Sequence, residues 1–262
     1  MQSLRFWERN LMPITIKSAR EIELMTEAGR ILEIVHNELE KALKPGMSTL
    51  DIDRLGEEII RSYGCVPSFL NYNGYPASIC VSVNEEVVHG IPSSKRILKE
   101  GDIVGLDAGV IYKGYHSDAA RTHAIGEVSK EAKDLIRVTR ECFFEGIKYA
   151  KEGNHLYDIS RAIGRYATER GYGVVEDLCG HGIGSQLHEA PEIPNYEMNR
   201  RGVKLRKGMT LAIEPMINIG THAVEWLADD WTVVTADGSL SAHYENTVLI
   251  TEDEPILLTL SK

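Results

Sequence analysis

Two strand-like runs joined by a glycine-containing turn place the strongest constraint on the fold. Residues 102–112 and 115–124 flank Lys113-Gly114, and a two-residue turn of this kind between two such runs is typical of a β-hairpin. The turn pairs Tyr112 with Tyr115 and so fixes the register of every residue before and after it. The sequence therefore predicts a long antiparallel hairpin near the middle of the chain.

This register places two aspartates on the same face of the hairpin. Counting back from the turn pairs Gly109 with Asp118, and Asp107 lies two residues before Gly109. Because side chains alternate between the two faces of a strand, Asp107 and Asp118 become diagonal neighbours with Cβ atoms roughly 7 Å apart. Two carboxylates at that separation can share metal ions. Taken alone, such a pair is more often part of a solvated surface.

The surroundings of the acidic residues favour a metal site. Leu106-Asp107-Ala108 and Leu211-Ala212-Ile213-Glu214 place carboxylates in apolar segments, where an unpaired charge is costly to desolvate. No comparable set of lysines or arginines is interleaved with these motifs, so divalent cations are the better counter-charge. Oxygen-rich ligation with one imidazole favours Mn, Fe, Co or Zn over calcium. The predicted ligands are Asp107, Asp118, His181, Glu214 and Glu245.

The histidines differ in their local setting. His181 lies between glycines, which permit a close approach of backbone and substrate. His89 and His188 lie in similar segments rich in glycine and proline. A lone histidine is more often a hydrogen-bonded structural residue than a ligand, and this interpretation is applied to His36, His116, His123, His155, His222 and His243.

Composition narrows the class of protein. A net charge of -10 and a pI near 5.4 argue against direct nucleic-acid binding, which depends on clustered lysine and arginine. The four cysteines are far apart and form no C-x-x-C pair, so neither a zinc finger nor a disulfide framework is indicated. The chain shows no secretion signal and no segment of transmembrane length. We expect a cytoplasmic protein that does not associate with membranes.

Helix and strand signals are interleaved without regular β-α-β alternation, which favours the α+β class. The order of two helices followed by strands occurs twice along the chain. This hints at pseudo-symmetry but by itself does not decide the fold. We expect a short N-terminal arm over residues 1–13 and one domain over residues 14–262. Helices are predicted from Ser18 to Pro45, from Ser48 to Gly64, from Ser129 towards Gly153 and from Leu156 to Gly171. Strands are predicted at about 79–83, 102–112, 115–124, 210–218, 231–235 and 241–250.

These motifs resemble those of the methionine aminopeptidases of the short bacterial type, over about residues 14–258. The resemblance rests on residues 84–92, on the two aspartates of the hairpin, on residues 180–191, on Ile213-Glu214-Pro215 and on Glu245. It implies the pita-bread fold, a pseudo-two-fold antiparallel sheet core covered by helices. The interval from His181 to Glu214 leaves no room for the helical insertion of the second type, so type one is indicated.

The resemblance also implies an activity. Members of this family remove the initiator methionine from nascent polypeptides when the second residue is small. Asp118 and Glu245 would bridge two divalent metal ions, Asp107 would chelate one, and His181 with Glu214 would complete the other. A water that bridges the metals would attack the scissile carbonyl, with Glu214 transferring a proton. His89 and His188 would orient the substrate and stabilise the tetrahedral intermediate.

A pocket for the methionine side chain is implied in the same way, and an apolar, aromatic cleft suits an unbranched thioether. Phe69 stands where a smaller residue is frequent, Leu187 where an aromatic residue is common, and Asn246 where many relatives carry histidine. These departures leave the chemistry intact and affect the pocket's width and preference. The predicted substrate-binding residues are Phe69, Tyr72, Tyr75, Cys80, Leu187 and Trp231, together with His89 and His188.

Two other functions are weighed against this one. A proline-specific peptidase of the same fold, such as a prolidase or an X-Pro aminopeptidase, usually carries a sizeable N-terminal domain, whereas here the first motif begins within ninety residues. A binding module that has lost catalysis typically lacks metal ligands, whereas this chain keeps all five. The resemblance further implies a monomer that associates transiently with the ribosome, although no basic patch indicates a docking surface.

Overall fold

The structure, a computed structural model, describes residues 13–261. The predicted arm, residues 1–13, lies outside the described residues except for Pro13. Helices and antiparallel sheets alternate along the chain in two similar runs, which confirms the predicted α+β class. No helix in the described part of the chain is long and apolar enough to cross a membrane.

All four predicted helices are present. α1 (Ala19–Ala42) and α2 (Thr49–Ser62) begin with capping boxes, in which Ser18 and Ser48 accept a hydrogen bond from the first turn. Ser129 caps α3 (Lys130–Ile147) in the same way, and α4 (Leu156–Thr168) follows a short turn. These caps satisfy backbone N–H groups that have no partner inside the helix, which is why the sequence located the helix starts well.

The central hairpin has the predicted register. β4 (Ile103–Tyr112) and β5 (Tyr115–Ala124) pair Tyr112 with Tyr115 and Gly109 with Asp118. Lys113 and Gly114 both have positive φ, at 48° and 86°, as the tight turns of β-hairpins require. β1 (Val66–Pro67) and β2 (Ile79–Val83) pair with β4 and complete a four-stranded sheet.

The strands predicted at 210–218 and 241–250 are wrong as continuous elements, because each is divided at a glutamate. The first divides into β9 (Thr210–Ile213) and β10 (Met216–Asn218), and the second into β13 (Ser241–His243) and β14 (Asn246–Leu249). β9 pairs with β14 in one sheet and β10 with β13 in another. Pro215 contributes to the first break because it has no backbone N–H for a strand ladder.

The remaining strands are short. β12 (Val233–Thr235) begins later than the predicted 231–235 and lies between β3 (Glu86–Val88) and β11 (Val224–Trp226). β2 (Ile79–Val83) has the predicted bounds, but elements of two or three residues carry too little periodicity to be seen in a sequence. The others that the sequence did not predict are β1, β6 (Gly173–Val174), β7 (Gly180–Gly182), β8 (Glu189–Ile193), β15 (Ile256–Leu257) and the short 3-10 helix at Tyr72–Gly74.

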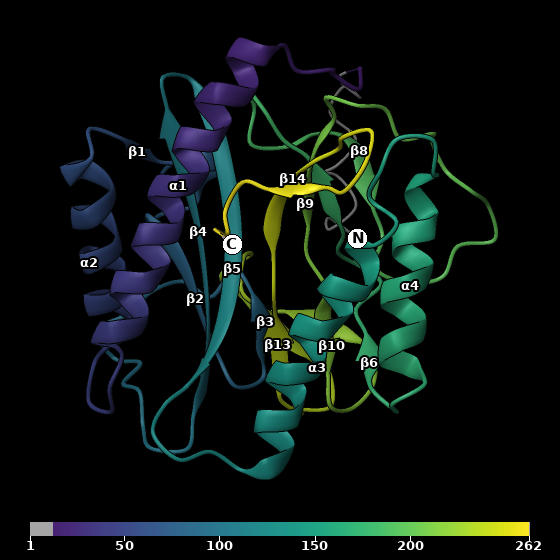
Figure 1. The fold of residues 1–262 in the computed structure, drawn as a ribbon. Helices are drawn as coiled ribbons and strands as arrows, with labels where there is room; N and C mark the ends of the chain where they lie inside the picture. The colour runs from purple at the N-terminus through teal and green to yellow at the C-terminus, as the bar shows by residue number, and fades with distance from the viewer. Residues whose placement is uncertain (1–12, 262) are drawn as a thin grey trace.

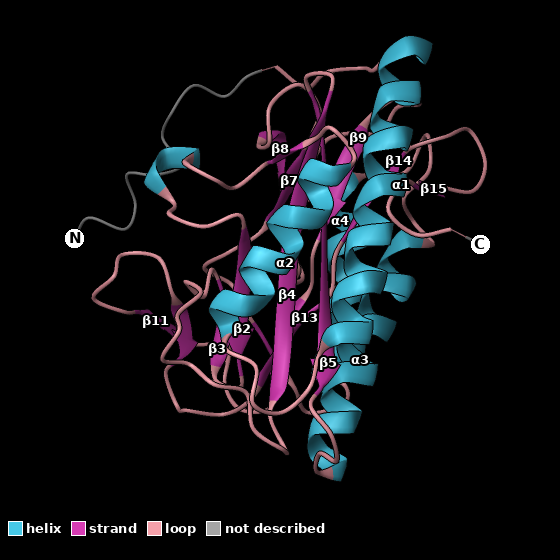
Figure 2. Cartoon of the chain, turned by 90° about the vertical axis from the view of Figure 1, so that its left-hand side faces the viewer, coloured by secondary structure: helices cyan, strands magenta, loops and turns pink. Residues whose placement is uncertain are grey.

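The helices cover one side of the sheets and leave the other side to loops and short strands. α1 packs against β4 and β5, while α3 packs against β10 and β13. Figure 1 shows α1 and α2 over one half of the molecule and α3 and α4 over the other, and in Figure 2 α1 and α3 lie on the opposite side of the strands from β11.

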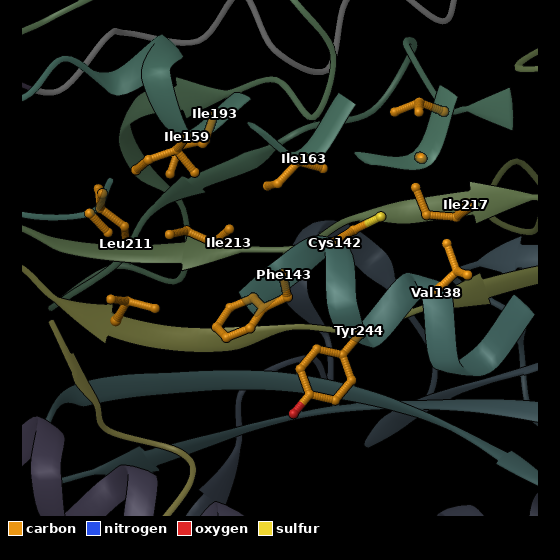
Figure 3. Packing of buried hydrophobic residues seen from close by; sticks show 14 of the residues in the cluster. Val138, Cys142, Phe143, Ile159, Ile163, Ile193, Leu211, Ile213, Ile217 and Tyr244 are labelled. Carbon is orange, nitrogen blue, oxygen red and sulfur yellow. The ribbon is translucent and has the colours of Figure 1, made fainter. Parts of the chain in front are cut away.

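Each half has its own hydrophobic core. The first half is filled by buried residues between Ile31 and Ile125. The second contains Phe143, Ile163 and Ile213, and Figure 3 shows the Phe143 ring close to that of Tyr244. Two cores under two helix pairs agree with the predicted pseudo-two-fold arrangement.

The C-terminal segment packs directly on α1, and this contact gives a test of the fold. A Cβ at Gly29 would lie 2.0 Å from the carbonyl oxygen of Leu258. Gly29→Ala is therefore expected to lower the free energy of unfolding by about 2 kcal/mol, because overpacking exceeds the gain in helix propensity. Urea unfolding followed by circular dichroism measures this.

The matched control is Gly56→Ala in α2. There the new Cβ meets no backbone atom: its nearest neighbours are side-chain methyl groups of Ile79, at 3.2 and 3.4 Å, and of Leu39, at 3.7 Å. We expect stability within about 1 kcal/mol of the parent protein, since higher helix propensity offsets mild crowding. Equal effects at the two glycines would contradict the packing of Leu258 on α1.

Candidate metal centre

The hairpin brings the two aspartates together as predicted. Asp118 faces Gly109 across the ladder and Asp107 faces Ala120, so the two carboxylates are diagonal neighbours on one face. Asp118 is buried, and its backbone N–H donates to the Thr247 hydroxyl at 2.9 Å. The hairpin thus supplies two acidic groups to the interior of the molecule.

His181 lies on β7 and turns one ring nitrogen towards the acidic groups. Its Nε2 is 3.7 Å from Asp118 Oδ2 and 3.7 Å from Glu214 Oε1. Its Nδ1 lies 2.9 Å from the carbonyl oxygen of Gly182, which can only accept a hydrogen bond. In the neutral ring the proton therefore belongs on Nδ1, and Nε2 keeps a lone pair for a metal. Burial lowers the pKa of His181 and favours this neutral form.

Glu214 and Glu245 lie at the two strand breaks. Glu214 follows β9 and Glu245 precedes β14, at corresponding points of two neighbouring strands. Around Glu245 the backbone pairs with β5 instead, because the Glu245 N–H donates to the Ala120 carbonyl at 3.0 Å. Arg121 donates to the Glu245 carbonyl and holds the break from behind. The breaks turn both glutamates towards the hairpin.

The predicted ligands converge. Ligand atoms of Asp118, His181 and Glu245 all lie within 4.8 Å of one another. Glu214 lies next to this group, with its Oε1 3.7 Å from His181 Nε2. Asp107 lies next to it through a side-chain hydrogen bond with Asp118. All five predicted ligands therefore lie in one cluster, although they come from segments spread over most of the chain.

The chemistry of the cluster fits divalent cations. Among the described residues, Asp107 Oδ1, Asp118 Oδ1 and Glu245 Oε1 are buried without a hydrogen-bond partner. Burial raises the pKa of Asp107 and of Glu214 to about 7. Burial and the neighbouring carboxylates raise the pKa of Asp118 and Glu245 well above their usual range. Buried acidic groups that lack counter-charge and share one face are what a cation site requires.

These pKa values predict that metal binding releases protons. Without metal, Asp107 and Glu214 are largely protonated at pH 6, whereas ligation needs the carboxylate form. We expect the apparent metal affinity to rise from pH 6 to pH 8, with at least about two protons released per loaded site at pH 6, since Asp118 and Glu245 also have raised pKa values. Calorimetric titration in two buffers of different ionisation enthalpy measures the protons. Release independent of pH would contradict the raised pKa values.

Two further histidines border the cluster. The His188 ring centroid is 4.2 Å from that of His181, and His188 Nδ1 lies 2.7 Å from the Tyr72 hydroxyl. His89 has a positive φ of 59° and packs edge-on against Trp231. Burial lowers the pKa of both imidazoles, in His89 to about 4. Both rings are neutral near pH 7 and can each donate one N–H.

The predicted pocket residues share one apolar cluster next to these histidines. Tyr75 packs edge-on against Trp231, with ring centroids 5.1 Å apart, and its hydroxyl donates to Gly90 O at 3.0 Å. Cys80 pairs with Asp107 across the sheet, which places this cluster beside the acidic groups. The cluster contains Phe69, Tyr72, Tyr75, Cys80, Leu187 and Trp231.

One histidine of the site was set aside in the sequence analysis. His243 Nε2 is 3.5 Å from Glu214 Oε2, and the ring is buried. It lies two residues before Glu245, and residues two apart on a strand share a face. That alternation was the available signal, but the break at Tyr244-Glu245 obscured it.

Comparison with known proteins agrees with this geometry. Residues 23–252 match metallopeptidase family M24. A methionine aminopeptidase of Clostridium acetobutylicum is 57% identical over 247 residues, which are 94% of this chain and 99% of that protein. The chain belongs to the methionine aminopeptidases of metallopeptidase family M24. A crystal structure of the methionine aminopeptidase of Thermotoga maritima has the same fold, with a TM-score of 0.93 and 46% identity over 95% of this chain and 100% of that chain.

A proline-specific peptidase of lower sequence identity shares this fold over part of its length. An Xaa-Pro dipeptidase from Bacillus anthracis aligns with a TM-score of 0.77 and 27% identity, over 95% of this chain but only 63% of that one. The alignment therefore leaves more than a third of the dipeptidase chain unmatched. Membership of a metallopeptidase family makes the chain a hydrolase that uses divalent metal.

Proposed function

We propose that this enzyme removes the N-terminal methionine from nascent proteins whose second residue is small. The observation that carries the proposal is the convergence of Asp118, His181 and Glu245 beside an apolar, aromatic cluster. The acidic groups provide a metal site, and the cluster provides a surface for a thioether. Identities of 57% and 46% to named methionine aminopeptidases support the same substrate.

Two divalent ions, of Mn, Fe, Co or Zn, are proposed as the cofactors. Asp118 and Glu245 would lie between them, Asp107 would hold one, and His181 with Glu214 would hold the other. Bound there, the metals supply a water of lowered pKa and polarise the scissile carbonyl. Four carboxylates balance the charge of two divalent ions, which supports this number.

The surrounding side chains have distinct proposed roles. Glu214 lies beside the other acidic groups and 3.7 Å from His181 Nε2, and it is proposed, as the family resemblance implies, to accept a proton and pass it to the leaving amine. When the Tyr72 hydroxyl donates to His188 Nδ1, the other ring nitrogen of His188 carries the proton. His188 and His89 can then donate to the substrate carbonyl oxygen and stabilise the charge that develops there.

The pocket for the methionine side chain is proposed to be formed by the apolar cluster. Phe69 and Leu187 are both buried in it, at 8% and 2% exposure, and they replace residues of different size in many relatives. These two positions would set the pocket's width. Tyr75, Cys80 and Trp231 would form its other walls.

Several broader features complete the proposal. Residues 14–262 would act as a single catalytic domain that works in the cytoplasm as a monomer, with transient ribosome contact when nascent chains emerge. Neither a membrane nor nucleic acid is expected as a partner. The net charge of -10 supports the last expectation.

The test is release of free methionine from Met-Ala-Ser by chelator-stripped protein, before and after addition of Mn, Co, Fe or Zn. Ala-Pro-Ala is assayed alongside. Metal-dependent release of methionine supports the proposal and ranks the metals. Cleavage of the proline peptide alone would move the enzyme to the proline-specific branch, and no cleavage with any metal would favour a binding module.

A further inference from the structure

A short segment before the first helix reaches the loop that carries His188. The Lys17 N–H donates to the Gly208 carbonyl at 2.8 Å, which fixes the segment beside the start of β9. The loop after β7 is fixed to the same strand, where the Ile183 N–H donates to the Thr210 carbonyl at 3.1 Å. Two segments about 170 residues apart in sequence are therefore hydrogen-bonded to the same stretch of backbone, residues 208–210.

A buried ion pair joins them. Lys17 Nζ lies 2.7 Å from Glu189 Oε2, and the two side chains are only 4% and 2% exposed. The Thr15 hydroxyl donates to the same carboxylate oxygen at 2.7 Å. Burial opposes ionisation of Glu189, but the hydrogen bonds from Lys17 and Thr15 outweigh it and hold its pKa below the usual range. Glu189 is therefore a carboxylate at neutral pH.

The carboxylate also closes the loop on itself. Glu189 Oε1 accepts a hydrogen bond from the Gln186 N–H at 3.2 Å, so the turn from Gln186 to Glu189 is fixed at both ends. A Cβ at Gly184 would lie 2.3 Å from Lys17 Cε and 2.5 Å from Glu189 Oε1. The loop backbone at Gly184 is therefore packed directly against the two side chains of the ion pair.

His188 lies inside this closed turn, next to Glu189. Its ring must meet the Tyr72 hydroxyl on one side and His181 on the other. A buried ion pair adds little net stability compared with an apolar pair, but it specifies one arrangement. A shift of about 1 Å in a group that contacts substrate can lower the rate about 100-fold. The pair is well placed to prevent such a shift.

We propose that the Lys17–Glu189 ion pair, with Thr15, is a positioning device that holds His188 against the substrate. The inference rests on the function proposed above and assigns a role in it to residues 15–17. Neither Lys17 nor Glu189 belongs to the metal centre or the methionine pocket. They act through the turn of His188.

The test is a double-mutant cycle between Lys17→Met and His188→Ala in metal-loaded enzyme. Lys17→Met keeps the length of the side chain and removes its charge. We expect kcat for Met-Ala-Ser to fall about 30-fold, while KM and the metal stoichiometry stay within about twofold. In the His188→Ala background, assayed at high enzyme concentration, the same substitution is expected to change kcat less than twofold. An equal fall in both backgrounds overturns the proposal.

Two further variants separate position from stability. Arg20→Met removes an ion pair that is 70% and 65% exposed, and it should leave kcat unchanged. If Lys17→Met fails to fold, Thr15→Val is used, because it removes the hydroxyl that donates to Glu189 and accepts from Lys17 but leaves the ion pair itself in place. It should lower kcat about threefold, again only when His188 is present. A loss in both backgrounds would overturn the proposal here too.

A measurement without turnover separates this inference from the proposed function. In protein labelled with ¹⁵N-histidine, the His188 signal is assigned by its loss in His188→Ala. Lys17→Met should shift that signal and leave the signal of His36, which is buried against Ala119, in place. An unshifted His188 signal would overturn the inference even if the enzyme releases methionine. A shift without methionine release by the parent protein would instead locate the failure in the proposed function.

Discussion

Asp118→Asn is expected to lower kcat/KM for methionine release by about 1000-fold or more. Asparagine keeps the size of the side chain but removes the carboxylate that Asp118 contributes beside His181 and Glu245. Metal affinity and transition-state stabilisation are lost together, because both depend on the same carboxylate. Steady-state assays with Met-Ala-Ser at several metal concentrations measure the loss. Excess metal should not restore the parent rate.

In the absence of metal, the same substitution should stabilise the fold. Burial and neighbouring carboxylates raise the pKa of Asp118 well above its usual range, so its charge is unfavourable there. Removing the charge is expected to raise the midpoint of thermal unfolding in chelator. Asp134→Asn, on the exposed side of α3, is the control and should change neither property. Activity near the parent level in Asp118→Asn would exclude Asp118 as a ligand.

Loading the site with metal is expected to stabilise the protein by about 4 kcal/mol when free metal exceeds its dissociation constant about 1000-fold. For a chain of this size, that corresponds to a rise of roughly 10 °C in the unfolding midpoint. Scanning calorimetry with and without chelator measures it. Calcium, which prefers all-oxygen sites, should give a much smaller shift.

The two raised carboxyl pKa values give the pH dependence of the metal-free protein a contribution of defined sign. The folded-state pKa values of Asp107 and Glu214 are raised from 3.8 and 4.5 to about 7. A carboxyl group with a raised folded-state pKa stabilises the fold below its unfolded pKa, and this stability is lost as pH rises to about 7. Buried histidines such as His89 and His188 have lowered pKa values and act in the opposite sense, but they are present in the parent protein and in Asp107→Asn alike. Between pH 5 and pH 7.5 the metal-free parent should therefore lose more stability, or gain less, than Asp107→Asn does, and an equal change in both proteins would refute the interpretation.

Much of the site could be predicted because one short turn fixes the pairing of residues along the whole hairpin. The two-residue turn at Lys113-Gly114 fixed the register, and the register alone brought Asp107 and Asp118 together. The helix starts followed from serine caps that act within one turn. Both are short-range effects, which a single sequence contains.

The strand breaks at Glu214 and Glu245 could not be predicted in the same way. Pro215 gave a hint at the first, but the second depends on Arg121 and on Ala120, which lie over a hundred residues away and meet Glu245 only in the folded chain. The convergence of the two glutamates with the hairpin was supplied by family resemblance, not by spacing. His243 was missed for the same reason.

Because the fold has two halves, the metal centre has a structural role as well as a chemical one. Asp107 and Asp118 belong to the half under α1 and α2, whereas His181, Glu214 and Glu245 belong to the half under α3 and α4. Each half has an apolar core of its own, and the buried acidic groups of the metal centre are contributed from both halves. Metal ions bound there would be held by ligands from both halves and would link the halves directly. The centre that is proposed to carry out catalysis would then also be a cross-link that stabilises the fold.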